Sequence, residues 1–316
     1  MKVNSTRLLW VVQQFRRYYD RQFTDLLARS GLTMREMDVI LFLTNNPGHD
    51  TARDVTELRR CAAWYQEQKP EPMDLLSFDG LRLHARYLPA EGPSKGRVLL
   101  FHGYRSLVLE DLAGLIPFYH SLGYDLLIPD QRAHGDSEGQ FIGFGVLERK
   151  DCVSWLRYLD SRFGPAPTFL AGVSMGATTV LMAAGEELPE DVRGVIGDCG
   201  FTSPRDIIAH QTRAQLHLPA FPLVPLTSLL SRLLAGYGFS DCSTLDTLAR
   251  TELPVLLIHG ETDDFVPTEM SRRNYAACRS EKELLLIPDA GHGGAYLVGG
   301  ETYRSAVTSF LNKHNP

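Results

Sequence analysis

The sequence predicts an α/β fold, with a mostly parallel β-sheet of eight strands and helices on both of its faces. Apolar or β-rich runs alternate with helical patterns along most of the chain. Several of these runs, such as "RVLLF", "YDLLIP" and "PVLLIH", contain almost no polar residue, which is typical of parallel strands buried on both faces. A chain of 316 residues, 44% of them hydrophobic, can also build the large core that this fold requires.

The predicted elements follow one another at intervals that suit this fold. Strands are predicted at 74–78, 81–88, 97–102, 124–129, 167–173, 193–198, 254–259 and 283–287. Helices are predicted at about 111–121, 146–162, 175–186, 267–279 and 301–313. Asp79-Gly80 separates the first two strands and is a turn signal, so we expect an antiparallel hairpin to lead into the parallel strands.

The N-terminal segment differs from the rest, and residues 1–61 predict a helical appendage. A long amphipathic helix is expected at 6–29, and a second helix is expected after Thr33. A third, short helix is expected from Thr51 to about Leu58.

The remaining residues, 62–316, form the predicted main domain, which contains one long segment without strands. Residues 201–250 are apolar and punctuated by prolines, as in "LHLPAFPLVPLTSLLSRLLAGYGF". Loops of this length are usually functional, so we predict a helical lid over a site. The alternative interpretation is that these apolar residues pack only on their own domain.

Charge and cysteine content exclude several classes of function. The net charge is −6, which gives no reason to expect nucleic acid or an anionic membrane surface as a partner. The five cysteines are scattered and form no CxxC pair, so we expect neither disulfides nor zinc. The apolar patch Leu8–Val12 is too short for a membrane span or a signal segment. We therefore expect a cytoplasmic protein.

The pentapeptide Gly172-Val173-Ser174-Met175-Gly176 joins a predicted strand directly to a predicted helix. A strand that ends in Gly-x-Ser-x-Gly and turns at once into a helix is a nucleophile elbow, which holds the serine at the carboxyl edge of the sheet. The plain alternative is that the small residues only allow the strand and the helix to pack closely. Serine needs a base to remove its proton, and histidine suits that task near neutral pH.

His292 is the predicted base, since it lies in the Gly-rich loop "PDAGHGGAY" after the last strand. His102 and His259 end strands and are expected to be structural. The carboxylate that orients His292 is expected in "PVLLIHGETDDFVP". There Asp263 is favoured over Asp264, and Asp198, at the end of another strand, is an outside candidate.

Acyl transfer also requires donors for a developing oxyanion. The backbone N–H of Met175, directly after the serine, is one candidate donor. The N–H of Tyr104, in the loop "HGYRS" after the strand "RVLLF", is the other. Tyr104 is also a candidate pocket residue, together with Phe221, Leu223 and Phe265.

The segments "LLFHGYRS", "YDLLIPDQRAHGDSEG", "AGVSMGA", "LLIHGETDDFVP" and "AGHGG" occur in this order. Together they resemble the α/β-hydrolase superfamily over about residues 62–314. More narrowly, the chain is similar to bacterial serine hydrolases of the esterase, lysophospholipase and S9-type peptidase groups. The resemblance implies an α/β-hydrolase fold and a triad in which Ser174 is the nucleophile, Asp263 the acid and His292 the base.

The segment "LTMREMDVILFLTNNPGHDTARDVTELRR" and the helix before it resemble the start of a MarR-type regulator, over about residues 5–60. No recognition helix or β-wing follows Arg60, so we expect no DNA binding. We expect these helices to pack on the hydrolase or to pair two subunits into a homodimer.

The function predicted from these observations is hydrolysis of a small-molecule carboxylic ester through an acyl-enzyme, without a metal or cofactor. The alternative enzyme is an S9-type serine peptidase or amidase. A non-enzymatic alternative is a ligand-sensing regulator that uses the hydrolase domain as a receptor.

Overall fold

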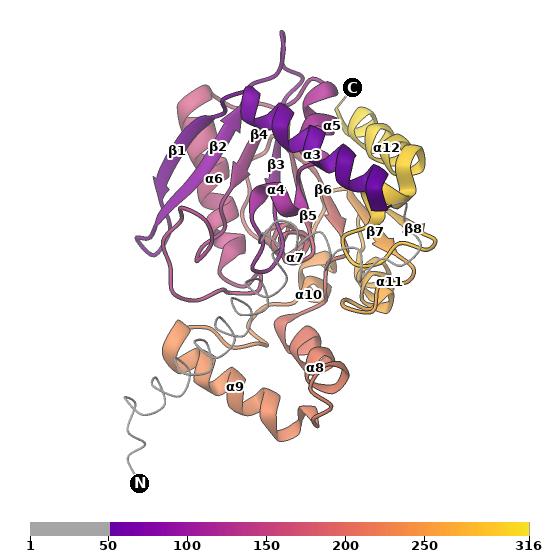
Figure 1. Ribbon diagram of the computed structural model, residues 1–316. Helices are drawn as coiled ribbons and strands as arrows, with labels where there is room; N and C mark the ends of the chain where they lie inside the picture. The colour runs from indigo at the N-terminus through magenta and orange to yellow at the C-terminus, as the bar shows by residue number, and fades with distance from the viewer. Residues whose placement is uncertain (1–50, 316) are drawn as a thin grey trace, which may run out of the picture. The chain divides into compact units, whose positions relative to one another are not determined.

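An eight-stranded sheet forms the centre of the computed structural model, which describes residues 51–315 (Figure 1). Its order is β1-β2-β4-β3-β5-β6-β7-β8, with β1–β2 and β2–β4 antiparallel and all other pairs parallel. The strands are β1 (Glu71–Leu76), β2 (Arg82–Leu88), β3 (Arg97–Phe101), β4 (Asp125–Pro129), β5 (Thr168–Val173), β6 (Val192–Asp198), β7 (Val255–Gly260) and β8 (Lys282–Ile287). The fold class, all eight predicted strands and the hairpin are therefore confirmed.

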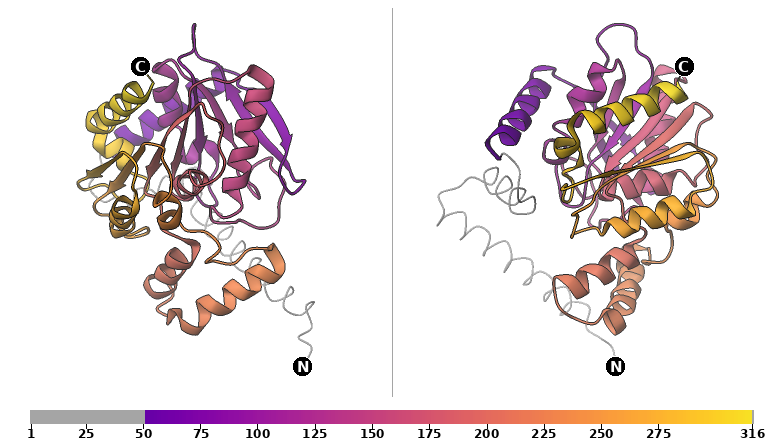
Figure 2. Two further views of the ribbon diagram at one scale, coloured as in Figure 1. Left: turned by 180° about the vertical axis from the view of Figure 1, so that it is seen from behind. Right: turned by 90° about the vertical axis from the view of Figure 1, so that its right-hand side faces the viewer.

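Helices cover both faces of this sheet (Figure 2). One core lies under α3 (Thr51–Glu67), α5 (Leu115–Ser121) and α12 (Ala295–His314). The other lies under α6 (Glu148–Phe163) and α7 (Met175–Ala183), close to α10 (Thr244–Leu248) and α11 (Thr268–Ala277). Successive side chains of a strand point to opposite faces, which explains why β3 is apolar throughout. Val98 belongs to the first core and Leu99 to the second, and neither is exposed to solvent.

Two predicted helices have different bounds in the structure. The helix expected at about 111–121 is divided into the short α4 (Val108–Asp111) and α5, because Leu112 leaves the helical conformation and ends α4. The helix expected at 301–313 begins earlier, since α12 includes a first turn from Ala295 that is separated by a break at Gly300, where φ is +49°. Glycine accepts this left-handed conformation without strain.

Helix α3 continues well beyond the expected end at Leu58 and corrects that prediction. Its apolar residues keep helical spacing as far as Tyr65, which is buried in the core below α5 and α12. Trp64 packs edge-on against His120, with ring centroids 5.2 Å apart. Residues Ala52–Pro316 form one compact unit. The helices expected at 6–29 and after Thr33, with the MarR-like resemblance, lie outside the described residues.

The segment 201–250 folds as helices, namely α8 (Pro204–Ala214), α9 (Ala220–Ala235) and α10. Helix α8 starts where Ser203 caps it by accepting a hydrogen bond from the backbone N–H of Asp206. Figure 2 shows α8 and α9 apart from the helices that flank the sheet, beyond the ends of the parallel strands. Within residues 51–315, no helix has the length and apolar character needed to cross a bilayer.

Candidate active site

Ser174 occupies a sharp turn between β5 and α7. Its backbone has φ 56° and ψ −116°, a conformation that non-glycine residues rarely adopt. Gly172 and Gly176 make the turn sterically possible, because a Cβ on Gly172 would overlap the backbone of Gly176, and one on Gly176 would overlap the carbonyl of Phe101. The pentapeptide therefore has the geometry of a nucleophile elbow, and it places the serine at the start of α7.

Three side chains from distant parts of the chain form a hydrogen-bonded series at this turn. His292, in the loop between β8 and α12, has its Nε2 2.9 Å from Ser174 Oγ. The other ring nitrogen, Nδ1, lies 2.8 Å from Asp263 Oδ2, in the loop after β7. All three loops leave the carboxyl ends of parallel strands, so the sheet itself brings the groups together.

Asp263 is held by four donors. Its Oδ1 accepts hydrogen bonds from the backbone N–H groups of Phe265, at 3.0 Å, and Val266, at 2.8 Å. Its Oδ2 contacts His259 Nε2, at 3.1 Å, in addition to His292. Burial alone would raise the pKa of Asp263, but the hydrogen bonds from the two histidines outweigh it and lower the pKa to about 2. The carboxyl group is therefore ionised at neutral pH.

Asp263 in turn acts on the pKa of His292. Burial disfavours the imidazolium form, but the hydrogen bond and the negative charge of Asp263 outweigh burial and raise the pKa. The carboxyl groups of Asp111 and Asp198 act in the same direction. The site thus stabilises the protonated imidazole that forms when a base takes a proton.

The other carboxylates considered for the acid do not contact His292 through their side chains. Asp264 is exposed, and its backbone carbonyl lies 3.2 Å from His210 Nε2. Asp198 is buried, and burial raises its pKa to about 7. Its Oδ1 has no hydrogen-bond partner among the described residues. The geometry therefore favours Asp263.

His259 was expected to be structural, and the structure shows a contact that the sequence did not reveal. The ring is fully buried, with Nδ1 2.6 Å from Ser271 Oγ. Nε2 faces both Val266 O, at 2.9 Å, and Asp263. Because a carbonyl only accepts, Nε2 carries the proton, and His259 donates to the carboxylate. The sequence shows that His259 lies at the end of a strand, but it does not show that its ring contacts Asp263 in the loop after β7.

The two candidate oxyanion donors lie at the elbow and in the loop after β3. Met175 is the first residue of α7, where backbone N–H groups have no partner within the helix. In the second loop, the N–H of Gly103 donates to Asp111 Oδ2 at 2.5 Å, and that of Arg105 donates to His134 Nε2 at 2.9 Å. The backbone N–H groups on both sides of Tyr104 are thus engaged in other hydrogen bonds. The N–H of Tyr104 therefore remains the candidate oxyanion donor between them.

A cavity of about 320 Å³ opens beside Ser174. The candidate pocket residues Tyr104 and Phe265 line it, and the centroid of the Phe265 ring lies 4.9 Å from that of the His292 ring. Phe221 and Leu223, the other two candidate pocket residues, are not among its lining residues, and the Phe221 side chain is 79% exposed. The lining also includes residues that were not predicted, four of them from α8: Phe144, Phe201, Ile207, Ile208, Gln211, Thr212, Gln215, Leu216 and Val266.

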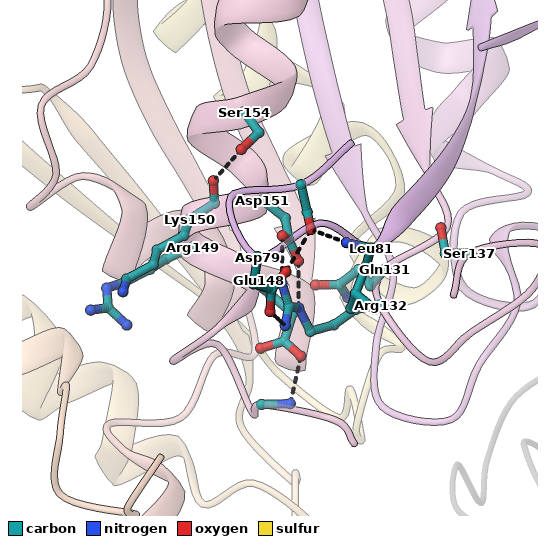
Figure 3. Close-up of polar contacts among 12 residues, drawn as sticks. Asp79, Leu81, Gln131, Arg132, Ser137, Glu148, Arg149, Lys150, Asp151 and Ser154 are labelled. Carbon is teal, nitrogen blue, oxygen red and sulfur yellow. Dashed lines mark hydrogen bonds and ion pairs between the residues drawn. The ribbon is translucent and has the colours of Figure 1, made fainter. Parts of the chain in front are cut away.

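The buried carboxylate of Glu148 holds the loop that carries Phe144, and it lies close to a group of ion pairs centred on Arg132 (Figure 3). Arg132 forms ion pairs with Asp151, at 2.7 Å, and with Asp79, at 2.9 Å. Glu148, which is 1% exposed, accepts hydrogen bonds from the backbone N–H groups on both sides of Phe144, at 2.6 and 2.8 Å. Phe144 then stacks on Tyr104, with ring centroids 5.1 Å apart.

A second, larger cavity of about 540 Å³ lies between the end of α7 and α10. It is lined by polar and charged side chains, including Arg149, Glu186 and Asp246. Ser174 and His292 do not line it, so the smaller cavity is the one that adjoins the candidate nucleophile.

A mostly parallel sheet with a serine on an elbow, a histidine after the last strand and a carboxylate after the preceding one defines the α/β-hydrolase class. The chain belongs to the alpha/beta hydrolase family, whose model matches residues 98–301. It is 31% identical to protein YqkD of Bacillus subtilis over 230 residues, which cover 72% of this chain and 75% of YqkD.

Solved structures of other proteins have the same fold. The esterase Pf2001 of Pyrococcus furiosus matches with a TM-score of 0.62 and 23% identity, over 79% of this chain and 95% of that one. Est1E of Butyrivibrio proteoclasticus, solved with ferulic acid bound, matches with a TM-score of 0.61 and 19% identity. That match covers 77% of this chain and 98% of Est1E.

Proposed function

We propose that the protein is a serine hydrolase that cleaves carboxylic esters through an acyl-enzyme. The observation that carries this proposal is the series of hydrogen bonds from Ser174 through His292 to Asp263, beside an apolar cavity. The series supplies a nucleophile, a base and a group that orients the base, and the cavity supplies a place for the acyl group.

In the proposed reaction, Ser174 Oγ attacks the ester carbonyl while His292 Nε2 takes the hydroxyl proton. The N–H groups of Tyr104 and Met175 hold the negative charge that develops on the carbonyl oxygen. His292 then gives its proton to the leaving alcohol, and the acyl group stays on Ser174. A water molecule, deprotonated by His292, attacks the acyl-enzyme, and the carboxylic acid and free Ser174 are released.

The cavity supports a hydrophobic acyl group or a small aryl group as the preferred substrate part. Aromatic and branched side chains line most of its wall, while Gln211, Thr212 and Gln215 contribute polar atoms on the α8 side. The volume of about 320 Å³ lies at the small end of ligand sites. The esterase name of Pf2001 and the aromatic acid bound to Est1E agree with this choice.

The proposal is tested by labelling the purified protein with a fluorophosphonate probe and by assaying a panel of p-nitrophenyl esters from acetate to decanoate. We expect one label per chain on the peptide that contains Ser174, and a preference for medium-length acyl groups. Ser154→Ala, on the exposed side of α6, is the matched control and keeps both labelling and activity. Absence of labelling and of hydrolysis across the panel would refute the proposal.

The same assay separates the ester hydrolase from the peptidase or amidase alternative. Peptidyl p-nitroanilides are offered in parallel with the esters at equal concentration. We expect a kcat/KM for esters that exceeds the value for anilides by orders of magnitude. The opposite order would assign the protein to the peptidase group.

A further inference from the structure

A group of potential metal ligands outside the candidate triad lies where β2 and β4 pair, at the carboxyl end of β4. His84 is in β2, Asp130 follows β4 directly, and Asp136 belongs to the loop after it. One ligand atom from each of these three side chains lies within 4.8 Å of the others. The backbone N–H of Asp130 donates to the carbonyl of His84 at 3.0 Å, so the sheet itself fixes two of the three residues next to each other.

His84 presents an unpartnered ring nitrogen to the two carboxylates. Its side chain is only 9% exposed, and Nδ1 lies 3.0 Å from Asp74 Oδ1. Nε2 is buried, has no hydrogen-bond partner in the described part of the chain, and is 4.0 Å from Asp136 Oδ2. When Asp74 accepts the proton of Nδ1, the lone pair on Nε2 lies beside the Asp136 carboxylate, and a cation bound between them would satisfy both groups. A carboxylate behind a histidine is the usual arrangement at metal sites.

The loop around the carboxylates is constructed by specific contacts. Asp130 Oδ2 accepts a hydrogen bond from the backbone N–H of Asp136 at 3.0 Å. Gly135, at φ +50°, lies so close that a Cβ there would overlap the Asp130 carboxylate. Ser137 Oγ donates to the carbonyl of Asp130 at 2.6 Å and accepts from the N–H of His84 at 2.8 Å. These contacts preorganise the ligands.

The side chains around this group carry a net negative charge that a divalent cation could neutralise. The acidic side chains around the group outnumber the basic ones by two, the members being Asp74, Asp130, Asp136 and Glu138 against Arg82 and Arg86. Arg86 lies 3.6 Å from Asp136 Oδ2, which is too long for a hydrogen bond. The Asp136 side chain is 68% exposed and is therefore free to turn.

We propose that His84, Asp130 and Asp136 bind one divalent metal ion of the zinc class. One imidazole and two carboxylates suit zinc, at about 2.0–2.2 Å from each ligand atom, with water in the fourth position. Ligand atoms of such a tetrahedral ion lie about 3.4 Å apart, so a small rotation of Asp136 closes the site. Nothing in this inference depends on the proposed ester hydrolysis, because none of these residues contacts the candidate triad.

The expected role of the ion is structural. It would join the loop 130–137 to β2, and this loop carries His134, which accepts the N–H of Arg105 beside Tyr104. Metal binding should therefore raise the melting temperature of the whole domain, since a ligand that binds only the folded state stabilises it.

The test uses tag-free, full-length protein treated with a chelator and then titrated with ZnCl₂ by calorimetry and by thermal unfolding. We expect binding of one equivalent and a rise in Tm. Asp136→Asn and His84→Gln should both fail to bind this equivalent of zinc. Asp136→Asn alters an exposed side chain and should fold normally. Asp74→Asn should weaken binding by about 10- to 100-fold, because it removes the group that orients His84. His217→Gln, at an exposed histidine outside the group, is the matched control and keeps wild-type binding.

A second arm distinguishes this site from the candidate active site, where Cys199, Asp263 and His292 also lie within 4.8 Å of one another. His292→Ala should keep the zinc equivalent and the rise in Tm. Co²⁺ in place of zinc should give visible absorption bands in the wild type and in His292→Ala but not in Asp136→Asn. Equal zinc isotherms and Tm values for the wild type and Asp136→Asn would overturn the proposal, as would loss of binding in His292→Ala alone.

Discussion

Ser174 is the proposed nucleophile, and replacing this single side chain tests that role directly. Ser174→Ala should reduce kcat for p-nitrophenyl butyrate by a factor of about 10⁴ to 10⁶, because the acyl-enzyme can no longer form. Circular dichroism should show an unchanged fold, and Ser154→Ala serves as the control. A Ser174→Ala variant that keeps a tenth of the wild-type rate would contradict the assignment.

The choice between two adjacent carboxylates gives a second test. Asp263→Asn should reduce kcat by about 10⁴, because asparagine favours the wrong tautomer of His292. Asp264→Asn should have little effect, since the Asp264 side chain is exposed and only its backbone carbonyl lies near His210. Rates of both purified variants on one ester decide the matter. A larger loss in Asp264→Asn would move the acid role to that residue.

The pH dependence of the rate follows from the shift at His292. The base acts only when its ring is neutral, so activity falls as pH drops through its pKa. The neighbouring carboxyl groups raise this pKa above the ordinary 6.5, so the acid limb of kcat/KM should have its midpoint above pH 6.5. Asp263→Asn should move this limb towards lower pH, because it removes the main cause of the shift. A midpoint below 6.5 in the wild type would contradict this explanation.

The candidate site was largely predictable at this scale, and its pocket was not. Ser174, Asp263 and His292 follow strand ends and lie in short patterns, so the sequence placed them at one edge of the sheet. Phe221 and Leu223 lie on α9. Which side of this helix is buried depends on how residues 201–250 pack together, and no local sequence pattern shows that. Phe144 was missed for a similar reason, since no local pattern shows that Glu148 binds the backbone on both sides of it or that its ring lines the cavity.

Among the helices, α6 acts on the shape of the cavity through Glu148 in its first turn, which binds the backbone on both sides of Phe144. Glu148→Gln should lower the free energy of unfolding by about 1–3 kcal/mol, because an amide cannot accept from both N–H groups as the carboxylate does. Loss of order at Phe144 should lower kcat/KM for bulky acyl esters more than for acetate. Denaturant unfolding and the ester panel measure the two effects.

The matched control for this element is Ser154→Ala, on the same helix α6 (Figure 3). It should change neither stability nor acyl preference, because Ser154 bonds only the carbonyl of Lys150 on the exposed side. A Glu148→Gln variant with wild-type stability would show that the two hydrogen bonds to Glu148 do not hold the loop. A uniform loss over all esters would show that Phe144 does not shape the acyl site.

Strands were predicted better than helices, for a physical reason. A central parallel strand is buried on both faces, so it must be apolar along its whole length, and β3, β5 and β7 are buried throughout. Helix ends depend on finer features. Helix α3 was expected to end near Leu58, yet the charged pair Arg59-Arg60 only occupies its exposed side, and the apolar pattern resumes at Cys61.

For the whole molecule, the position of α3 decides where the chain can be shortened. A protein that begins at Thr51 keeps α3 and should retain the wild-type ester rate. One that begins at Lys69 exposes the core against which Tyr65 and Trp64 pack, and should lose about 3–6 kcal/mol of stability. Thermal unfolding and ester assays of both proteins check this prediction. Equal stability of the two would show that α3 is dispensable.

The same shortened protein also addresses the expected role of the N-terminal residues. Light scattering of the full chain and of the protein that begins at Thr51 compares their masses. A dimer that becomes a monomer would support pairing through residues 1–50, as the sequence suggested. A salt-sensitive shift of DNA in a gel by the full chain alone would contradict the expected lack of nucleic-acid binding.

At position 174, catalytic activity and folding stability favour different residues, because the backbone there is strained. Glycine adopts a left-handed φ freely, whereas serine holds it only at the expense of folding free energy. Ser174→Gly would therefore relieve strain and destroy the nucleophile in the same step. This single substitution should give a protein that is more stable to heat but inactive. A screen of variants for thermal stability alone would therefore select against the catalytic serine.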